Sequence, residues 1–129
     1  MNRILVITPT YNERENLPKL AREVLGVAPE ANLLVVDDGS PDGTGALADR
    51  MSEADPRIQV VHRAGKMGLG SAYVEGFSRA LKDDYDYVFE IDADLSHDPR
   101  DIPRFVEAME REGADLVIGS RYVPGGRTV

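Results

Sequence analysis

Short runs rich in β-branched residues alternate along the chain with segments whose apolar residues recur at helical spacing. A helix between successive strands lets the chain re-enter the sheet in the same direction, which favours parallel strands with helices on both faces. Strands are predicted at residues 3–8, 33–36, 58–62, 85–91 and 116–119. We therefore predict an α/β fold with an open, mostly parallel sheet.

Four helices are predicted between and after these strands. The first follows Asn16, whose side chain suits an N-cap, and the second begins near Asp42 or Thr44. The third covers residues 69–81. The fourth covers residues 102–109, is opened by Asp101, and precedes Gly113, which suits a helix C-terminus.

The composition limits the classes of partner. The chain has 129 residues, enough for one core, and carries 15 Lys and Arg against 23 Asp and Glu, a net charge of −8. This acidity argues against nucleic acid and against broad adhesion to anionic lipid. The absence of cysteine excludes a disulfide scaffold, a thiolate nucleophile and a cysteine zinc site. Early apolar runs are too short for a signal peptide or a membrane span, so the cytoplasm is the expected location.

Polar and glycine-rich segments follow each predicted strand. In open α/β sheets, ligands bind beyond the carboxyl ends of the strands. These segments are residues 9–13, 37–44, 62–70, 92–97 and 120–122. We therefore expect a binding site along this edge of the sheet.

Asp92 and Asp94 flank one small residue after the fourth predicted strand. In an extended chain, such carboxylates point to the same side, about 6.5–7 Å apart. They could hold Mg²⁺ or Mn²⁺ and leave coordination positions for diphosphate oxygens. The alternative is a solvated acidic turn capped by Asp94, which an isolated pair would favour. Placement at a strand end, opposite a second aspartate pair, favours the metal site.

Asp37 and Asp38 cannot both point into the cleft, because neighbouring side chains on a strand alternate. One is expected to accept hydrogen bonds from a base or a ribose, and the other to cap or order the turn at residues 39–43. Turn chemistry alone is an equally weighted alternative, since this segment is a strong turn sequence by itself.

Three other features are weaker. Residues 66–71 open a helix after a glycine-rich loop, which suits either an anion or close helix–strand packing. Arg121 could bind a phosphate bidentately or pair with an aspartate of the same edge. His62 and His97 are expected in exposed or capping roles, not as metal ligands.

Five motifs occur in order along the chain. They are PTYNE at residues 9–13, VDDGSPDGT at 36–44, GLGSAY at 68–73, DADLSH at 92–97 and GSRY at 119–122. Together they resemble the polyprenol-phosphate (dolichol-phosphate) mannosyltransferases of glycosyltransferase family 2, which have the GT-A fold. The resemblance covers nearly the whole chain.

The resemblance implies transfer of mannose from GDP-mannose to a polyprenyl monophosphate, with inversion, at the cytoplasmic face of a membrane. It implies a divalent metal, Mg²⁺ or Mn²⁺, held by Asp92 and Asp94 with Ser96 as a further candidate ligand. Asp94 and Arg121 are the implied catalytic residues. The implied nucleotide-sugar pocket is lined by Pro9, Tyr11, Glu13, Val36, Asp38, Asp92, Ala93, Asp94 and Arg121.

Family members continue beyond the point that corresponds to Val129. We therefore expect residues 1–129 to form one donor-binding domain of apparently truncated GT-A type, without the usual C-terminal acceptor portion. Such a chain would be either a fragment or a minimal form that relies on a homo-oligomer or a membrane-anchoring partner.

Three alternatives remain at this point. The chain could be a non-catalytic sugar-nucleotide-binding module, or a related transferase that uses UDP-glucose. A phosphorylation receiver domain is disfavoured, because it needs an aspartate pair after the first strand, whereas here the acidic residues follow the second and fourth.

Overall fold

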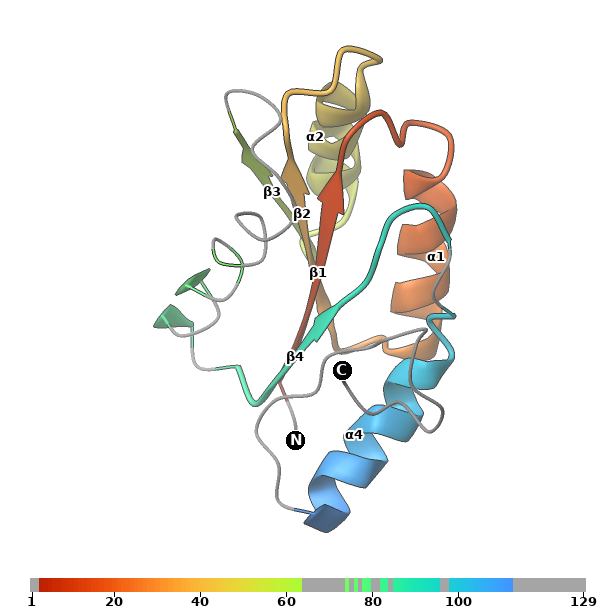
Figure 1. Ribbon diagram of the computed structural model, residues 1–129, viewed down its shortest axis with the longest axis vertical. Coiled ribbons are helices and arrows are strands. Elements are labelled where there is room, and N and C mark those ends of the chain that lie inside the picture. The colour runs from red at the N-terminus through yellow and green to blue at the C-terminus, as the bar shows by residue number, and fades with distance from the viewer. Residues whose placement is uncertain are drawn as a thin grey trace.

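The computed structural model describes residues 3–63, 74, 76, 78–79, 82–83, 85–95 and 98–112. Its elements are β1 (Ile4–Thr10), α1 (Leu17–Val27), β2 (Asn32–Asp37), α2 (Thr44–Ala54), β3 (Ile58–His62), β4 (Tyr87–Glu90) and α4 (Asp101–Glu112). The four strands form one parallel sheet in the order β3-β2-β1-β4 (Figure 1). The predicted parallel α/β class is confirmed.

The strand bounds differ slightly from those predicted. β1 extends two residues further, to Thr10, where it pairs with Asp37 at the end of β2. β4 ends at Glu90 and is shorter than the predicted strand at both ends. The predicted strand at residues 116–119 and most of the predicted helix at residues 69–81 lie outside the described residues.

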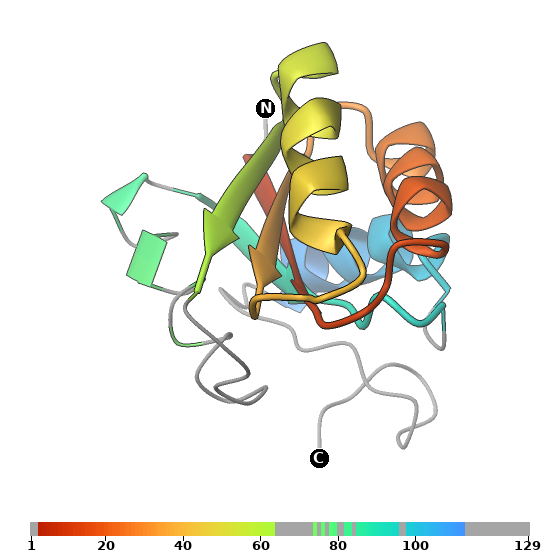
Figure 2. The same cartoon turned by 90° about the horizontal axis from the view of Figure 1, so that it is seen from above.

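The core consists of two apolar layers, because β1 and β2 are buried on both faces. One layer lies under α1, α2 and α4, which cover the same side of the sheet in Figure 2. The other contains Leu5, Ile7, Leu34, Val36 and Val88. Burial of these side chains stabilises the sheet by about 1.5–3 kcal/mol for each fully buried large residue.

A helical segment packs closely against the second layer. Residues 74, 76, 78, 79 and 82 are helical. A Cβ added at Gly76 would lie 2.5 Å from Ile7 Cδ1, so only glycine allows this approach. Helices therefore cover both faces of the sheet, as predicted.

The first helix shows the predicted apolar periodicity. Its buried residues are Leu17, Leu20, Ala21, Val24 and Leu25. Asn16 precedes the helix as predicted, but its side chain does not cap it. Instead, Asn16 Nδ2 donates to Glu13 Oε1 at 3.2 Å, and its backbone is already helical at φ −87° and ψ −28°. A cap needs an extended residue at this position, so the predicted capping bond is wrong.

The sheet order creates a switch point beside β1. The chain passes from β1 to β2 and β3 on one side and then returns to β4 on the other. Open α/β sheets bind ligands at such a point, beyond the carboxyl ends of the strands. The loops that follow β1 and β2 meet at that end, uppermost in Figure 1.

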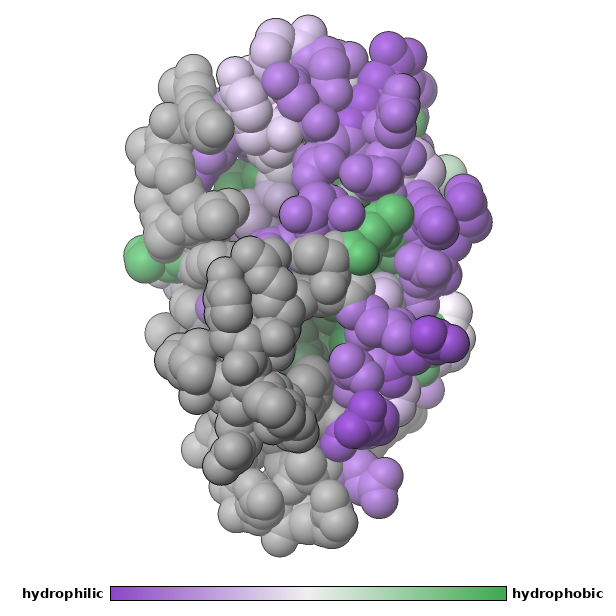
Figure 3. Space-filling view, turned by 45° about the vertical axis from the view of Figure 1, so that its right-hand side comes forward, coloured by the Kyte–Doolittle hydropathy of each residue, from purple (hydrophilic) through white to green (hydrophobic). Residues whose placement is uncertain are grey.

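The coloured part of the face shown in Figure 3 is mostly hydrophilic, with small separate apolar patches. Among the described residues, no helix is both long enough and apolar enough to cross a bilayer.

Candidate nucleotide and metal site

Asp37 orders the loop at residues 37–44, called here the β2 loop. Asp37 is 2% exposed. It accepts hydrogen bonds from Thr10 Oγ1 at 2.7 Å, Ser40 Oγ at 2.6 Å and Ser40 N at 3.1 Å. Gly45 leaves room for it, since a Cβ there would lie 2.9 Å from Asp37 Oδ2. Asp37 is therefore the member of the aspartate pair that orders the turn.

Asp38 points elsewhere and forms an ion pair with Arg63. Arg63 Nε lies 2.5 Å from Asp38 Oδ1, and the two side chains are only 7% and 8% exposed. The backbone N–H of Arg63 also donates to Asp37 O at 2.8 Å, which fixes the end of β3 against the β2 loop. Arg63 is not among the predicted site residues, although a basic residue directly after a strand and opposite an acidic turn is a usable signal.

The segment at residues 11–14, called here the β1 loop, is bound to the β2 loop. The backbone N–H groups of Asn12 and Glu13 donate to Ser40 Oγ and Thr44 Oγ1, each at 3.0 Å. Arg14 N donates to Asp42 Oδ2 at 3.3 Å. The two loops therefore behave as one hydrogen-bonded unit at the carboxyl edge of the sheet.

The residues predicted for the nucleotide pocket differ in accessibility. Tyr11 is 39% exposed and Glu13 is half-buried at the surface. Pro9 is buried within β1, and Val36 is fully buried in the second apolar layer. Arg121, Ser96 and His97 lie outside the described residues, as do the glycine-rich residues 66–71.

The segment at residues 91–95, called here the β4 turn, carries Asp92 and Asp94. Ala93 and Asp94 lie in a turn, and Leu95 has a left-handed backbone with φ 66°. The extended geometry assumed for the two aspartates is therefore wrong. Burial nevertheless alternates, because Ile91 and Ala93 are in the core while Asp92 is half-buried and Asp94 is exposed. Both aspartates thus lie on the outer side of the turn.

Three aspartates act on Glu13 at this edge. Burial raises the pKa of Glu13, the hydrogen bond from Asn16 opposes this shift, and the charges of Asp94, Asp42 and Asp92 raise it further. The β4 turn therefore lies close to the β1 and β2 loops. Clustered carboxylates of this kind suit a hard divalent cation, which would relieve their repulsion. Within the described ranges, however, no three acidic or histidine side chains converge as a ready-made metal site.

Glu90 is a buried acid that sequence analysis missed. It ends β4, pairs in register with Ile7 and is 9% exposed. Burial first, and then the charge of Asp92, raise the pKa of Glu90 to about 7. Its position in an otherwise apolar strand was the available signal.

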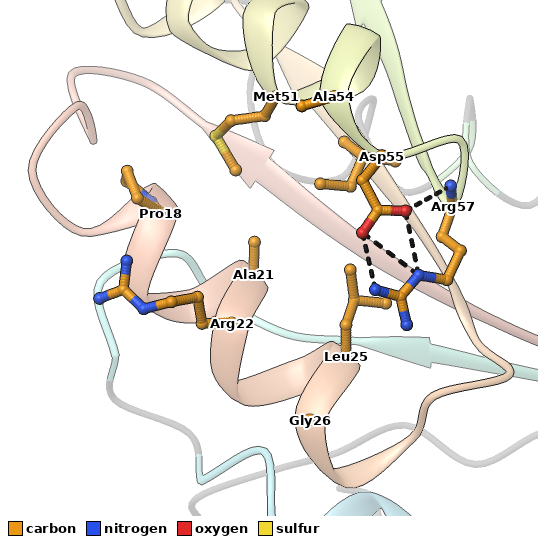
Figure 4. A pocket seen from close by; sticks show the side chains of 10 residues that line it. Pro18, Ala21, Arg22, Leu25, Gly26, Met51, Ala54, Asp55 and Arg57 are labelled. Atoms are coloured by element: carbon orange, nitrogen blue, oxygen red, sulfur yellow. Dashed lines mark hydrogen bonds and ion pairs between the residues drawn. The ribbon is translucent and has the colours of Figure 1, made fainter.

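His62 is exposed, as expected, and its Nε2 lies 2.8 Å from Asp49 Oδ1. A pocket of about 600 Å³ lies elsewhere, between α1 and α2 (Figure 4). It runs from Pro18 to the start of β3, where Asp55 and Arg57 pair at 2.7 Å. None of the predicted site residues lines it, so it is separate from the carboxylate edge.

A parallel sheet of this order, with acidic side chains at its switch point, is typical of α/β folds that bind nucleotides. The chain belongs to glycosyl transferase family 2, whose family model matches residues 5–129.

Named relatives are similar over nearly all of this chain. It is 57% identical to a polyprenol monophosphomannose synthase of Mycolicibacterium smegmatis over 125 residues, covering 96% of this chain and 47% of the relative. It is 52% identical to an undecaprenyl-phosphate mannosyltransferase of Micrococcus luteus over 127 residues, covering 98% of this chain and 51% of the relative. The chain therefore spans about half the length of these relatives.

A solved structure has the same type of fold. A mannosyltransferase from Pyrobaculum calidifontis, in complex with GDP-Man and Mn²⁺, superposes with a TM-score of 0.71 at 26% identity. The match covers 83% of this chain and 32% of that protein. The predicted GT-A-type architecture is confirmed.

Proposed function

We propose that this chain binds GDP-mannose together with a divalent cation and provides the donor site for transfer of mannose to a polyprenyl monophosphate, with inversion. The observation that carries the proposal is the acidic surrounding of Glu13 at the switch point, where the charges of Asp94, Asp42 and Asp92 raise its pKa. The names of the relatives and of the superposed mannosyltransferase support the donor and the acceptor.

The donor would be held by residues from three loops. Pro9, Tyr11, Glu13, Val36, Ala93 and Asp38 are the proposed nucleotide-sugar contacts. Asp92 and Asp94, with Ser96, are the proposed metal ligands, and both Mg²⁺ and Mn²⁺ accept such oxygen donors. Arg121 is proposed to bind phosphate oxygens through its planar guanidinium.

The proposed chemistry needs charge stabilisation more than a strong base. The bound cation would supply stabilisation of the charge that develops on the departing GDP. A phosphate monoester has a second pKa near ~6, so the acceptor is already ionised at neutral pH and can attack the anomeric carbon from the opposite face. Arg121 is then proposed to hold the diphosphate in line for this displacement, with Asp94 as a ligand of the cation. We propose that the reaction occurs at the cytoplasmic face of a membrane, where a polyprenyl phosphate would present its headgroup.

Calorimetry with GDP-mannose in the presence and absence of MnCl₂ tests the donor site. We expect binding that requires the metal and that weakens in Asp94→Asn, with Asp49→Asn as an acidic control outside the site. Metal-independent binding, or equal affinity in Asp94→Asn, would contradict the proposal.

A transfer assay with radiolabelled GDP-mannose and polyprenyl phosphate tests the reaction. Lipid-linked mannose is the expected product. Binding without any transfer would instead favour the non-catalytic module, and a preference for UDP-glucose would favour the related transferase.

A further inference from the structure

The β2 loop contains two acid–hydroxyl pairs of the same design. Ser40 Oγ donates to Asp37 Oδ1 at 2.6 Å, and Thr44 Oγ1 donates to Asp42 Oδ1. A carboxylate can only accept, so each hydroxyl proton is directed to its aspartate. Each hydroxyl oxygen therefore keeps its lone pairs for another donor.

The two hydroxyl oxygens accept hydrogen bonds from two successive backbone N–H groups of the β1 loop. Asn12 N donates to Ser40 Oγ and Glu13 N donates to Thr44 Oγ1, both at 3.0 Å. The donor direction is unambiguous, because a backbone N–H cannot accept. Two parallel chains of hydrogen bonds, called here the relays, thus link an aspartate through a hydroxyl to a peptide group of the neighbouring loop.

The relays stabilise a specific backbone conformation of the β1 loop. Asn12 has φ 56°, in the left-handed region, which asparagine enters more readily than most other non-glycine residues. This conformation sets the directions of Tyr11 and Glu13, which flank Asn12. Thr44 is fully buried, and Asp37 packs closely against Gly45. The groups to which the β1 loop is bound are therefore themselves fixed in place.

We propose that Ser40 and Thr44 are positioning residues of the nucleotide site, which hold the β1 loop in the form that binds the nucleotide. This inference rests on the proposed function, because it assigns the β1 loop to nucleotide binding. It differs from turn chemistry alone, in which the hydroxyls would stabilise the β2 loop without any effect on affinity.

Paired substitutions distinguish the effect of losing the hydroxyl from the effect of changing the size of the side chain. Thr44→Val keeps the shape and removes the acceptor, whereas Thr44→Ser keeps the hydroxyl. Ser40→Ala removes the other acceptor at a half-buried position, so it tests the proposal even if Thr44→Val lowers the folded fraction. Ser52→Ala is the matched control, since Ser52 Oγ donates to Ile58 O at 2.8 Å near the start of β3, at the opposite edge of the sheet.

The affinity for GDP, measured by calorimetry in saturating MnCl₂, is the first readout. One lost hydrogen bond in the binding form corresponds to about fivefold to tenfold weaker binding. We expect this loss in Ser40→Ala and Thr44→Val. Thr44→Ser and Ser52→Ala are expected to stay within about twofold of the unsubstituted chain, although Ser52→Ala also loses a hydrogen bond.

Amide hydrogen exchange at Asn12 and Glu13 is the second readout. Ser40→Ala is expected to accelerate exchange at Asn12, and Thr44→Val at Glu13, whereas Ser52→Ala leaves both unchanged. If exchange accelerates but GDP affinity does not change, the hydroxyls serve the fold alone and the inference is overturned. Equal losses of affinity in Ser52→Ala would overturn it as well.

The same measurements distinguish this inference from the proposed function. If the unsubstituted chain binds GDP with Mn²⁺ but Ser40→Ala and Thr44→Val bind equally well, only the inference fails. If the unsubstituted chain binds no GDP under these conditions, the proposed function fails and the inference falls with it.

Discussion

The β2 loop and the β4 turn lie at the same edge of the sheet, but their aspartates have different surroundings. Asp37 and Asp38 are buried, and hydroxyls, backbone N–H groups and Arg63 satisfy their charges. Asp94 is exposed and Asp92 half-buried, and both act on Glu13 as repelling charges. The two acidic motifs therefore differ in what their charges act on. Asp37 and Asp38 belong to a frame of hydrogen bonds and ion pairs that holds the β2 loop, whereas Asp92 and Asp94 repel Glu13, and we propose that a bound cation would offset this repulsion.

The largest expected effect comes from breaking the frame at Arg63. Arg63→Met leaves the Asp38 carboxylate buried without the Arg63 cation, and losing one partner of a buried pair costs about 3–5 kcal/mol. Urea unfolding measures this loss. Arg63→Met combined with Asp38→Leu is expected to recover most of the stability, because neither charge then remains buried.

A matched surface pair provides the control. Arg57 and Asp55 pair at 2.7 Å at the other edge of the sheet, but their side chains are 39% and 27% exposed. Arg57→Met is expected to change stability by within about 1 kcal/mol. Equal effects at Arg57 and Arg63 would show that burial does not separate the two pairs.

The second effect concerns Glu90, which ends β4 directly before the β4 turn. Its pKa is raised from 4.5 to about 7, so the folded chain favours its protonated form. The stability it contributes is fully present below pH 4.5 and is lost as the pH rises to about 7. At 1.36 kcal/mol per pKa unit, the loss is at most about 3 kcal/mol.

Glu90→Gln removes this ionisation. We expect its stability relative to the unsubstituted chain to increase between pH 4.5 and about 7 and then level off. Urea unfolding at a series of pH values without added metal measures the difference. A difference that stays constant with pH would mean that Glu90 ionises normally in the fold.

The strands and helices that carry this site could be predicted from the sequence, but its side-chain contacts could not. The strand at residues 58–62 and the start of α2 near Thr44 were predicted correctly, because apolar spacing and turn residues define them locally. The Asp38–Arg63 pair joins residues 25 positions apart, and no local pattern specifies it. An acidic turn at Asp94 was the alternative to the extended geometry, but the left-handed conformation of Leu95 could not be predicted, because Leu95 is neither glycine nor asparagine.

The third effect is on ligand binding at the β4 turn. Asp94→Asn removes a proposed metal ligand and one repelling charge, so GDP binding in MnCl₂ is expected to weaken about tenfold or more, because ligand charge sets the affinity for a hard cation. Stability is expected to be unchanged or slightly higher, since Asp94 repels Glu13. Calorimetry and urea unfolding measure the two quantities. A large loss of stability would place Asp94 in the frame with Asp37 and Asp38.

The smallest effect is a shift in the pKa of Glu13, which lies in the neighbouring loop and responds to the charges of the β4 turn. Burial and the charges of Asp94, Asp42 and Asp92 hold the pKa of Glu13 above its usual value. Mg²⁺ bound at this edge would offset those charges, so its addition is expected to lower the pKa of Glu13. The carboxyl-carbon chemical shift, followed by NMR over a pH series, measures the change. Asp98, whose pKa is lowered chiefly by its hydrogen bond with Arg100, is the internal control and should not respond. If Glu13 and Asp98 shift equally, the ion acts only by general screening, and the proposed division between frame and ligand site loses its electrostatic support.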